Sequence, residues 1–297
     1  MAVNVEAAAG PVAAPRTATR RDPGRGDAER SQFLLYVVLF VLSGLFMVPF
    51  LWLVLTSLKP PAEVFDKNWL PEPFYPQNYA DVFNNRPVGR WIFNSFVVAI
   101  LAVVSVIFSS SLVAYGFARL RFRGNKQLFA LVMSTYLLPS IITLVPTFLI
   151  WKELGAINTF FPLWAGNLFG SAFYIFMLRQ FLFTIPQDLV DAARVDGAGY
   201  FRIYWSIMLP LIKPAIAAVA VFEFGAKWND FFTPLIYINS TDLYTMALGL
   251  STFKEELDQQ WALWMAGSVV MTIPMIVLFF LAQRYFVEGV ATTGLKG

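Results

Sequence analysis

The sequence predicts an all-α integral membrane protein with six transmembrane helices and one surface helix between the fourth and the fifth. Three observations lead to this fold class. Of the 297 residues, 58% are hydrophobic and only 14% are charged, whereas a soluble domain carries roughly 25% charged residues. The mean hydropathy is +0.61. The apolar residues also stand in unbroken runs that are long enough to cross the hydrocarbon core of a bilayer.

The composition excludes several kinds of chemistry. The sequence contains no cysteine and no histidine, so it offers no disulfide, no thiol nucleophile, no imidazole base and no usual zinc site. We therefore expect no metal site and no catalytic residue. The sequence also lacks a phosphate-binding loop. We expect the chain to bind no cofactor of its own and no nucleic acid.

The N-terminal residues 1–30 show no apolar periodicity and are rich in Ala, Pro, Gly, Arg and Asp. Such a composition predicts a disordered tail. The rest of the chain, residues 31–297, is predicted to form one six-helix membrane domain.

Six apolar runs are each longer than the roughly 20 residues that a membrane-spanning helix needs. They are Phe33–Thr56, Ile92–Ala118, Gln127–Trp151, Leu163–Ile185, Leu211–Ile238 and Ala262–Gln283. The third run contains Pro139 and Pro146, which are expected to kink its helix. In the second run, hydroxyl groups at 109–111 can hydrogen-bond within or between helices. The loop 57–91 is rich in proline and is predicted to be extended rather than helical.

The distribution of Lys and Arg predicts the orientation in the membrane. The N-terminal tail, the 116–126 loop, the 179–213 connection and the C-terminus together carry 15 of these residues, and the connections on the opposite side carry six. Cytoplasmic connections are the ones enriched in Lys and Arg. We therefore expect a multi-pass protein of the cell membrane, with both termini and residues 188–214 in the cytoplasm.

Residues 188–214 lie between the fourth and fifth spans and are too polar to cross a membrane. Their first part, from Asp191 to Ala198, is predicted to be a short helix that ends at Gly197, because glycine readily supplies the positive φ of a helix end. Asp191 in the first turn would complement the helix dipole.

Small side chains in this helix would let another surface approach closely, as small residues do at helix interfaces. The alternative is an amphipathic helix that lies on lipid. Three acidic residues, Asp188, Asp191 and Asp196, argue against that alternative, because an anionic membrane surface disfavours them. The segment is therefore interpreted as a docking element for a soluble partner.

A longer pattern runs through the same stretch. Its residues are Asp191-Ala192-Ala193, Asp196-Gly197-Ala198, Tyr204, Ile207, Leu209, Pro210 and Pro214. This pattern resembles the EAA loop of ABC importer permeases, in which EAA and DGA are followed by an aromatic residue and I-x-LP. In place of the family's Glu this chain has Asp191, whose side chain is one methylene shorter.

Other segments resemble the maltose-type carbohydrate permeases of this family. They are Thr56-Ser57-Leu58-Lys59-Pro60, Trp228-Asn229-Asp230-Phe231 and the C-terminal residues from Phe286 to Gly297. The resemblance extends from about residue 33 to the end of the chain. It implies a type I ABC importer permease-like fold that carries a sugar or a related polyol, or else a glycerol-phosphate-type substrate.

The resemblance also implies partners. A coupling helix would dock on a cytoplasmic ATPase through Asp191, Ala192, Ala193, Asp196, Gly197 and Ala198. The complete transporter would contain a second, non-identical permease, two ATPase subunits that hold ATP and Mg, and an extracytoplasmic substrate-binding protein. The spans themselves would contact membrane lipid.

Three charged residues in the fifth predicted span, Glu223, Lys227 and Asp230, stand at i, i+4 and i+7 on one helical face. Charges at such depth normally face the bundle interior or a water-filled cavity. With Trp228 and Asn229, this face is a candidate translocation path, since a sugar can stack on an indole and hydrogen-bond to an amide. The alternative, which the i, i+4 spacing of opposite charges favours, is a structural ion pair between Glu223 and Lys227.

Two other classes of function are weighed against an ATP-driven importer. An ion-coupled secondary transporter would need intramembrane ion ligands and often shows an inverted repeat. Only the charges of the fifth span qualify as ligands, and no repeat is visible. A membrane-embedded enzyme would need a catalytic constellation, and none is visible either. The sequence therefore favours a transport subunit that is not itself an enzyme.

Overall fold

A computed structural model describes residues 25–255 and 260–294. Every regular element in these ranges is helical, which confirms the all-α fold. The chain divides into two compact units, residues 1–51 and 52–297. The first unit consists of most of α1 (Arg25–Ser57), whose apolar stretch is long enough to span a membrane. Because α1 begins at Arg25, residues 25–30 are helical rather than part of the predicted tail, and residues 1–24 lie outside the described ranges.

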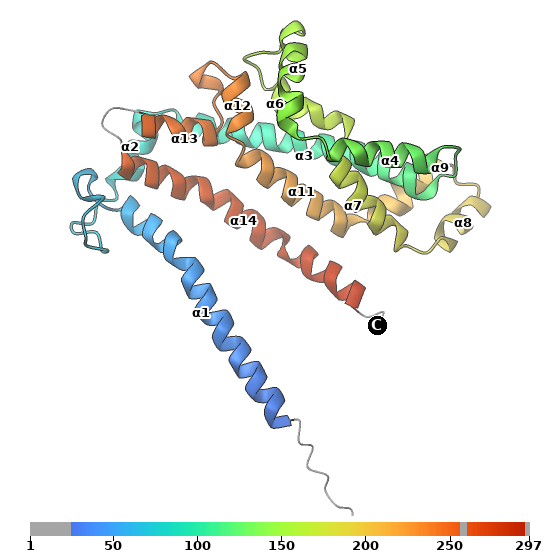
Figure 1. Cartoon of the computed structure of the whole chain (residues 1–297), viewed down its shortest axis with the longest axis horizontal. Coiled ribbons are helices and arrows are strands. Elements are labelled where there is room, and N and C mark those ends of the chain that lie inside the picture. The colour runs from blue at the N-terminus through green and yellow to red at the C-terminus, as the bar shows by residue number, and fades with distance from the viewer. Residues whose placement is uncertain (1–24, 256–259, 295–297) are drawn as a thin grey trace, which may run out of the picture. The chain divides into compact units, whose positions relative to one another are not determined.

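The second unit contains the other helices (Figure 1). In chain order they are η1 (Pro61–Glu63), α2 (Gln77–Asn85), α3 (Val88–Arg119), α4 (Asn125–Tyr136), α5 (Ser140–Glu153), α6 (Phe161–Trp164), η2 (Ala165–Phe169), α7 (Ala172–Phe183), α8 (Asp188–Val195), α9 (Tyr200–Ile203), the π-helical turn η3 (Tyr204–Met208), α10 (Leu209–Leu211), α11 (Lys213–Trp228), α12 (Phe232–Tyr237), η4 (Thr241–Leu243), α13 (Met246–Glu255) and α14 (Trp261–Gly294).

Four helical segments of the described chain are long and apolar enough to cross a membrane alone, and two bent helix pairs bring the number of candidate spans to six. Each of the six predicted spans overlaps one of these candidates, although three of them are not single helices. The C-terminal part of the predicted sixth span continues as helix to Gly294. Residues 295–297 of the C-terminal motif lie outside the described ranges.

The third predicted span breaks near Pro139. α4 and α5 meet there at 94°, because proline has no backbone N–H and disfavours helical geometry in the residue before it. Pro146 lies inside α5 without ending it. The fourth predicted span also breaks, at Gly170 between η2 and α7, where φ is +81°.

The fifth predicted span, Leu211–Ile238, is shorter than predicted and differs at both ends. α11 covers only Lys213–Trp228, and α12 is a separate short helix. The helix formed by Tyr200–Leu211 meets α11 at an angle of 76°. Pro214 fits the first turn of α11, where its missing N–H has no helical partner to lose.

The proline-rich loop 57–91 is not entirely extended, because it contains α2. Asn78 of α2 lies buried and its amide donates to the carbonyls of Ser57 and Lys59, at 2.9 and 2.8 Å. The carbonyls at the C-terminal end of a helix have no hydrogen-bond partner within the helix, and Asn78 supplies one here. The predicted extended conformation is therefore wrong for Gln77–Asn85.

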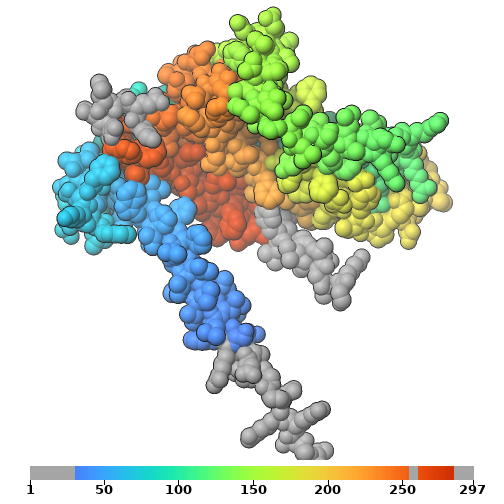
Figure 2. Space-filling view, in the orientation of Figure 1, coloured from blue at the N-terminus to red at the C-terminus, as the bar shows by residue number. Residues whose placement is uncertain are grey.

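α3 is the central helix of the second unit. It reaches from α13 at one end to α9 and η3 at the other, and it packs against α7, η2 and α11 along its length (Figure 1). α4 lies on the outside of α7, and Figure 2 shows the two side by side on one face. The core therefore follows α3, with one buried cluster at each of its ends.

The cluster at the N-terminal end of α3 depends on one glycine. Trp91 of α3 is buried against α13. A Cβ on Gly249 of α13 would lie only 2.2 Å from the Trp91 ring. Glycine at this position lets the indole lie directly on the α13 backbone.

Candidate functional site

The candidate docking helix is α8, which spans Asp188–Val195. It begins three residues earlier than predicted, and two acidic residues lie in its first turn with Arg194 in its last. These charges complement the helix dipole at both ends. Gly197, which follows the helix, has φ of +80°. The predicted helix end at this glycine is confirmed.

One face of α8 packs against the protein. Val190 is fully buried and Ala193 is 8% exposed, and both belong to the core cluster beside α7 and η3. The prediction that Ala193 is open to a partner therefore needs correction, since its small side chain fits the chain's own core. Ala198 is half-buried against the same cluster.

The opposite face of α8 is open. The exposed residues outside the buried face include Leu189, Ala192 and Val195, and Val195 is 89% exposed. Asp196, which follows the helix, is exposed as well. Gly197 extends this surface beyond the helix. Exposed apolar side chains gathered on a short polar helix are typical of a surface that another protein covers. Four predicted docking residues thus lie at this surface: Asp191, Ala192, Asp196 and Gly197.

Asp191 is the residue of α8 with the most polar contacts. Its Oδ1 accepts a hydrogen bond from Gln187 Nε2 at 3.2 Å and lies 3.8 Å from the guanidinium of Arg194. The Arg194 and Asp191 side chains are 41% and 58% exposed, so this ion pair contributes little stability by itself. The Arg194 guanidinium also lies over the Tyr200 ring, 5.2 Å from its centroid.

A stripe of polar residues on α3 holds the segment around α8. Ser111, Tyr115 and Arg119 follow each other at intervals of four, so they share one face of the helix. The Ser111 hydroxyl bonds the Tyr204 hydroxyl at 2.8 Å, and the Tyr115 hydroxyl donates to the Tyr200 carbonyl at 3.0 Å. Sequence reasoning missed this stripe, although the regular spacing of polar residues in an apolar run could have indicated it.

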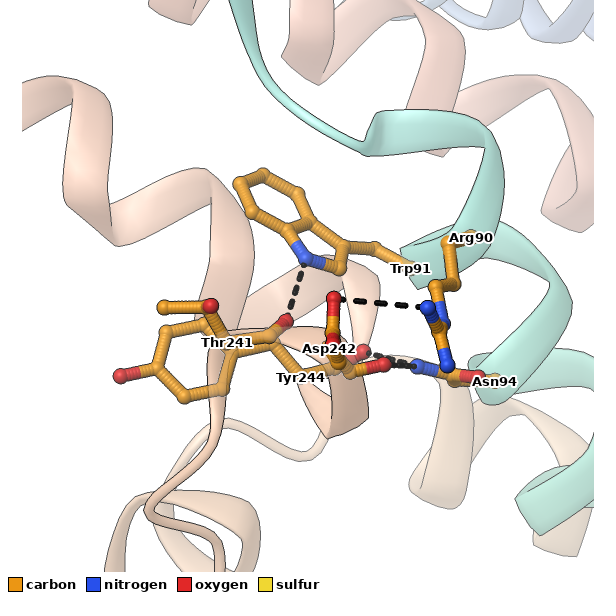
Figure 3. Close-up of polar contacts among 6 residues, drawn as sticks. All are labelled: Arg90, Trp91, Asn94, Thr241, Asp242 and Tyr244. Carbon is orange, nitrogen blue, oxygen red and sulfur yellow. Dashed lines mark hydrogen bonds and ion pairs between the residues drawn. The ribbon is translucent and has the colours of Figure 1, made fainter.

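The opposite end of α3 is fixed in the same way (Figure 3). Trp91 Nε1 donates to the Thr241 carbonyl, and Asn94 Nδ2 donates to the carbonyls of Asp242 and Tyr244, each at 2.9 Å. An exposed ion pair of 3.4 Å joins Arg90 to Asp242. The stretch around η4 is therefore attached to α3 through its backbone.

Glu223 lies in the interior of the helix bundle and is 7% exposed. Its Oε1 accepts a hydrogen bond of 2.5 Å from Asn167 Nδ2, and Tyr174 lies beside it. Asn167 also donates to the Ala102 carbonyl at 3.2 Å. Glu223 and Lys227, both described, form no ion pair with each other, so the predicted pair is not formed. Glu223 instead connects α11 to η2 and, through Asn167, to α3.

Trp228 is a second correction. Its side chain is fully buried, its Nε1 donates to the Met271 carbonyl at 2.9 Å, and its ring lies 4.8 Å from that of Phe96. No face of this indole is open for a sugar. The residue packs α11 against α14 and α3 instead.

The predicted face of charges does not continue beyond α11, because the helix ends at Trp228. Asp230 Oδ1 accepts a hydrogen bond of 3.0 Å from the backbone of Thr233 and so pairs one N–H group in the first turn of α12. Lys227 is half-buried. Asn229, one of the five predicted path residues, lines a cavity.

This cavity has a volume of about 360 Å³ and lies between the end of α11 and α14. Its lining residues are uncharged: Asn229, Leu250, Ser268, Met271, Thr272 and Met275. The hydroxyls of Ser268 and Thr272 donate to carbonyls of their own helix, each at 2.8 Å, so their oxygens can still accept. Sequence reasoning missed these two hydroxyls, which stand at i and i+4 in the sixth span.

Comparison with known proteins places this arrangement among transporters. The family model described as binding-protein-dependent transport system inner membrane component matches residues 28–292. The osmoprotective compounds uptake permease protein GgtD of Synechocystis is 32% identical, over 88% of this chain and 91% of that protein. The arabinooligosaccharides transport system permease protein AraQ of Bacillus subtilis is 31% identical, over 92% of this chain and 99% of that protein.

A solved structure has the same fold. It is a bacterial ABC transporter involved in the import of the acidic polysaccharide alginate, with a TM-score of 0.76 and 23% identity. The match covers 86% of this chain and 98% of that chain.

The role of Glu223 can be tested by two substitutions. We predict that Glu223→Gln leaves the thermal unfolding midpoint of the detergent-solubilised protein nearly unchanged, because the new amide oxygen can still accept from Asn167. Glu223→Leu should cost about 1–3 kcal/mol, since it removes the acceptor of a buried donor. If the charge itself were needed by Lys227, the Gln variant would lose as much stability as the Leu variant.

Proposed function

Because the chain belongs to the family of binding-protein-dependent transport system inner membrane components, we propose that it carries a sugar or a related polyol across the cell membrane. The chain is a permease subunit of an ABC transporter. Relatives that are named for oligosaccharide uptake, AraQ among them, support a carbohydrate substrate. The observation that carries the proposed mechanism is the open face of α8, which projects from a segment fixed to α3.

In this proposal the open face of α8 sits in a groove on a cytoplasmic ATPase subunit. Leu189 and Val195 would supply apolar contacts, and the small side chain of Ala192 would permit close approach. Asp191 and Asp196 would face cationic groups of the partner. The chain's own part in ATP use is mechanical, because ATP and Mg would be held by the partner.

The other parts of the proposed assembly follow from the same family. They are a second, non-identical permease, two ATPase subunits and an extracytoplasmic substrate-binding protein. The excess of Lys and Arg in the connections supports a cytoplasmic location for both termini. In this assembly the chain is a transport subunit and not an enzyme.

Transport would follow alternating access. ATP-driven closure of the ATPase dimer would move α8, and the bundle would change between two packings of its helices. Nucleotide can shift this equilibrium only if the complex binds it more tightly in one packing than in the other.

The cavity at Asn229 supports a neutral, hydroxyl-rich substrate. Its polar groups are an amide and two hydroxyls, which donate and accept hydrogen bonds as sugar hydroxyls do. A glycerol-phosphate-type substrate would call for a cation in the lining, and an ion-coupled carrier would call for a carboxylate. The lining residues include neither, so a sugar or polyol is the preferred cargo.

Docking is tested by co-purification of the ATPase subunit with variants of α8. We predict that Gly197→Leu loses the subunit, because Leu is strained at φ of +80° and blocks close approach. Asp191→Arg should weaken retention as well, since it reverses the charge of the first turn.

Gly155→Leu is the matched control. Gly155 also has a positive φ, of +66°, and no atom near its Cβ position, but it lies after α5 and away from α8. It should suffer the same backbone strain and still retain the ATPase. Docking through α8 is refuted if the Gly197 and Asp191 variants retain the ATPase as well as this control does.

The substrate path is tested by Thr272→Val, which keeps the side-chain shape and removes the hydroxyl from the cavity. We predict that ATP-driven uptake of arabinooligosaccharides into proteoliposomes falls roughly tenfold, the effect of losing about one hydrogen bond of 1.4 kcal/mol. Thr143→Val is the control, because the exposed Thr143 hydroxyl likewise donates to its own helix, at 3.0 Å. Equal uptake by both variants would exclude the cavity from the path.

A further inference from the structure

The C-terminal end of α3 is hydrogen-bonded both to the end of α7 and to the residue before α8. Arg119, the last residue of α3, is buried. One of its terminal nitrogens donates to Gln187 Oε1 at 2.7 Å. The other donates to the carbonyls of Leu182 and Ile185, the second at 2.6 Å. One cation therefore holds the end of α7 and the residue that precedes α8.

Gln187 extends this attachment into α8. Because its amide oxygen accepts from Arg119, its amide nitrogen must point the other way, and it donates to Asp191 Oδ1 one turn into the helix. Both bonds involve a charged partner, a guanidinium on one side and a carboxylate on the other. The bond from Arg119, at 2.7 Å, has the short length typical of a charge-assisted bond, and the bond to Asp191 is longer, at 3.2 Å.

The far end of α8 is attached to α3 independently. Tyr115, one turn before Arg119, donates to the Tyr200 carbonyl beyond α8. Between these two attachments α8 reaches the core only through Val190 and Ala193. Val190 anchors the first turn in the core, and the polar chain through Gln187 adds a second, directed connection from this turn to α3.

We propose that Arg119, Gln187 and Asp191 form a relay that fixes the start of α8 against α3, so that a displacement of α8 by the docked ATPase moves α3 with it. This inference rests on the proposed docking function of α8. Arg119 and Gln187 are positioning residues in this relay, since they act on the docking surface through Asp191. Docking supplies the force, and the relay transmits it to the membrane helices.

Substitutions of Gln187 can distinguish a relay between α3 and α8 from a role of Arg119 in capping α7 alone. Gln187→Leu removes both bonds of Gln187, to Arg119 and to Asp191, but leaves the Arg119 bonds to the carbonyls of Leu182 and Ile185 in place. Gln187 is exposed, so the variant can fold without a new buried clash. Gln187→Glu keeps an acceptor for Arg119 and places a second carboxylate beside Asp191, so it breaks only the second link.

The experiment uses the complete transporter reconstituted in lipid, with wild type, Gln187→Leu, Gln187→Glu and the control Gln127→Leu. Gln127 is an exposed residue of α4 outside the relay. Two quantities are measured: hydrogen exchange of the amides of residues 189–195, and the amount of arabinooligosaccharide imported per ATP hydrolysed.

For both Gln187 variants we expect exchange in α8 to be faster by on the order of tenfold, as for the loss of one charge-assisted hydrogen bond. Sugar imported per ATP should fall several-fold while the ATPase subunit still co-purifies. The Gln127 control should match wild type in both quantities. A purely structural role in capping α7 would leave both quantities unchanged in the Gln187 variants.

The relay is overturned if the Gln187 variants match the control, or if exchange rises while sugar per ATP stays at the wild-type value. Failure of the docking function gives a different result. In that case even the wild-type chain does not retain the ATPase subunit, and the transmission role falls with it whatever the exchange shows.

Discussion

The fold depends on the need to pair every polar backbone group inside a membrane, and α3 is where this need is met. A single helix satisfies its own backbone, but the irregular segments beside it cannot. α3 is 32 residues long, or about 48 Å at 1.5 Å per residue. Its polar side chains provide partners for those segments at both ends. Segments far apart in the sequence are thereby fixed to one rigid element.

The break at Gly170 is tolerated for the same reason. At the Gly170 break, the Ser110 hydroxyl accepts from the Ser171 backbone at 3.1 Å, and the Ser109 hydroxyl donates to the Asn167 carbonyl at 2.9 Å. The expectation that hydroxyls of this run bond between helices is confirmed. At this break, side chains of α3 thus pair backbone groups that the interrupted helix leaves without partners. The cavity at Asn229 and the docking helix therefore both lie on segments whose positions α3 helps to fix.

The sequence was sufficient for features that depend on residue type and local order. The six apolar stretches, the short polar helix and its end at Gly197 follow from hydropathy and from the conformational freedom of glycine. The surroundings of Trp228 could not be predicted, because a tryptophan that lines a path and one that packs in a core occupy the same positions in the hydropathy pattern. The predicted Glu223–Lys227 pair failed because an amide 56 positions away in the chain was the better-placed partner. From the sequence alone, Arg119 is only one of the positive charges that predict the cytoplasmic side. Its acceptors are mostly backbone carbonyls of a turn far away in the sequence, and such partners leave no mark in the residue pattern.

The central claim is that α8 and the end of α3 move as one body, and a spin-label distance tests it most directly. The chain has no native cysteine, so Asp188→Cys and Arg123→Cys can be labelled alone. Asp188 is an exposed residue of α8 outside the proposed docking contacts, and Arg123 is exposed just beyond α3. The distance distribution between the two labels should be the same in nucleotide-free and ATP-bound transporter, while transport proceeds. A shift of this distribution on ATP binding would show that α8 moves without α3 and would contradict the account.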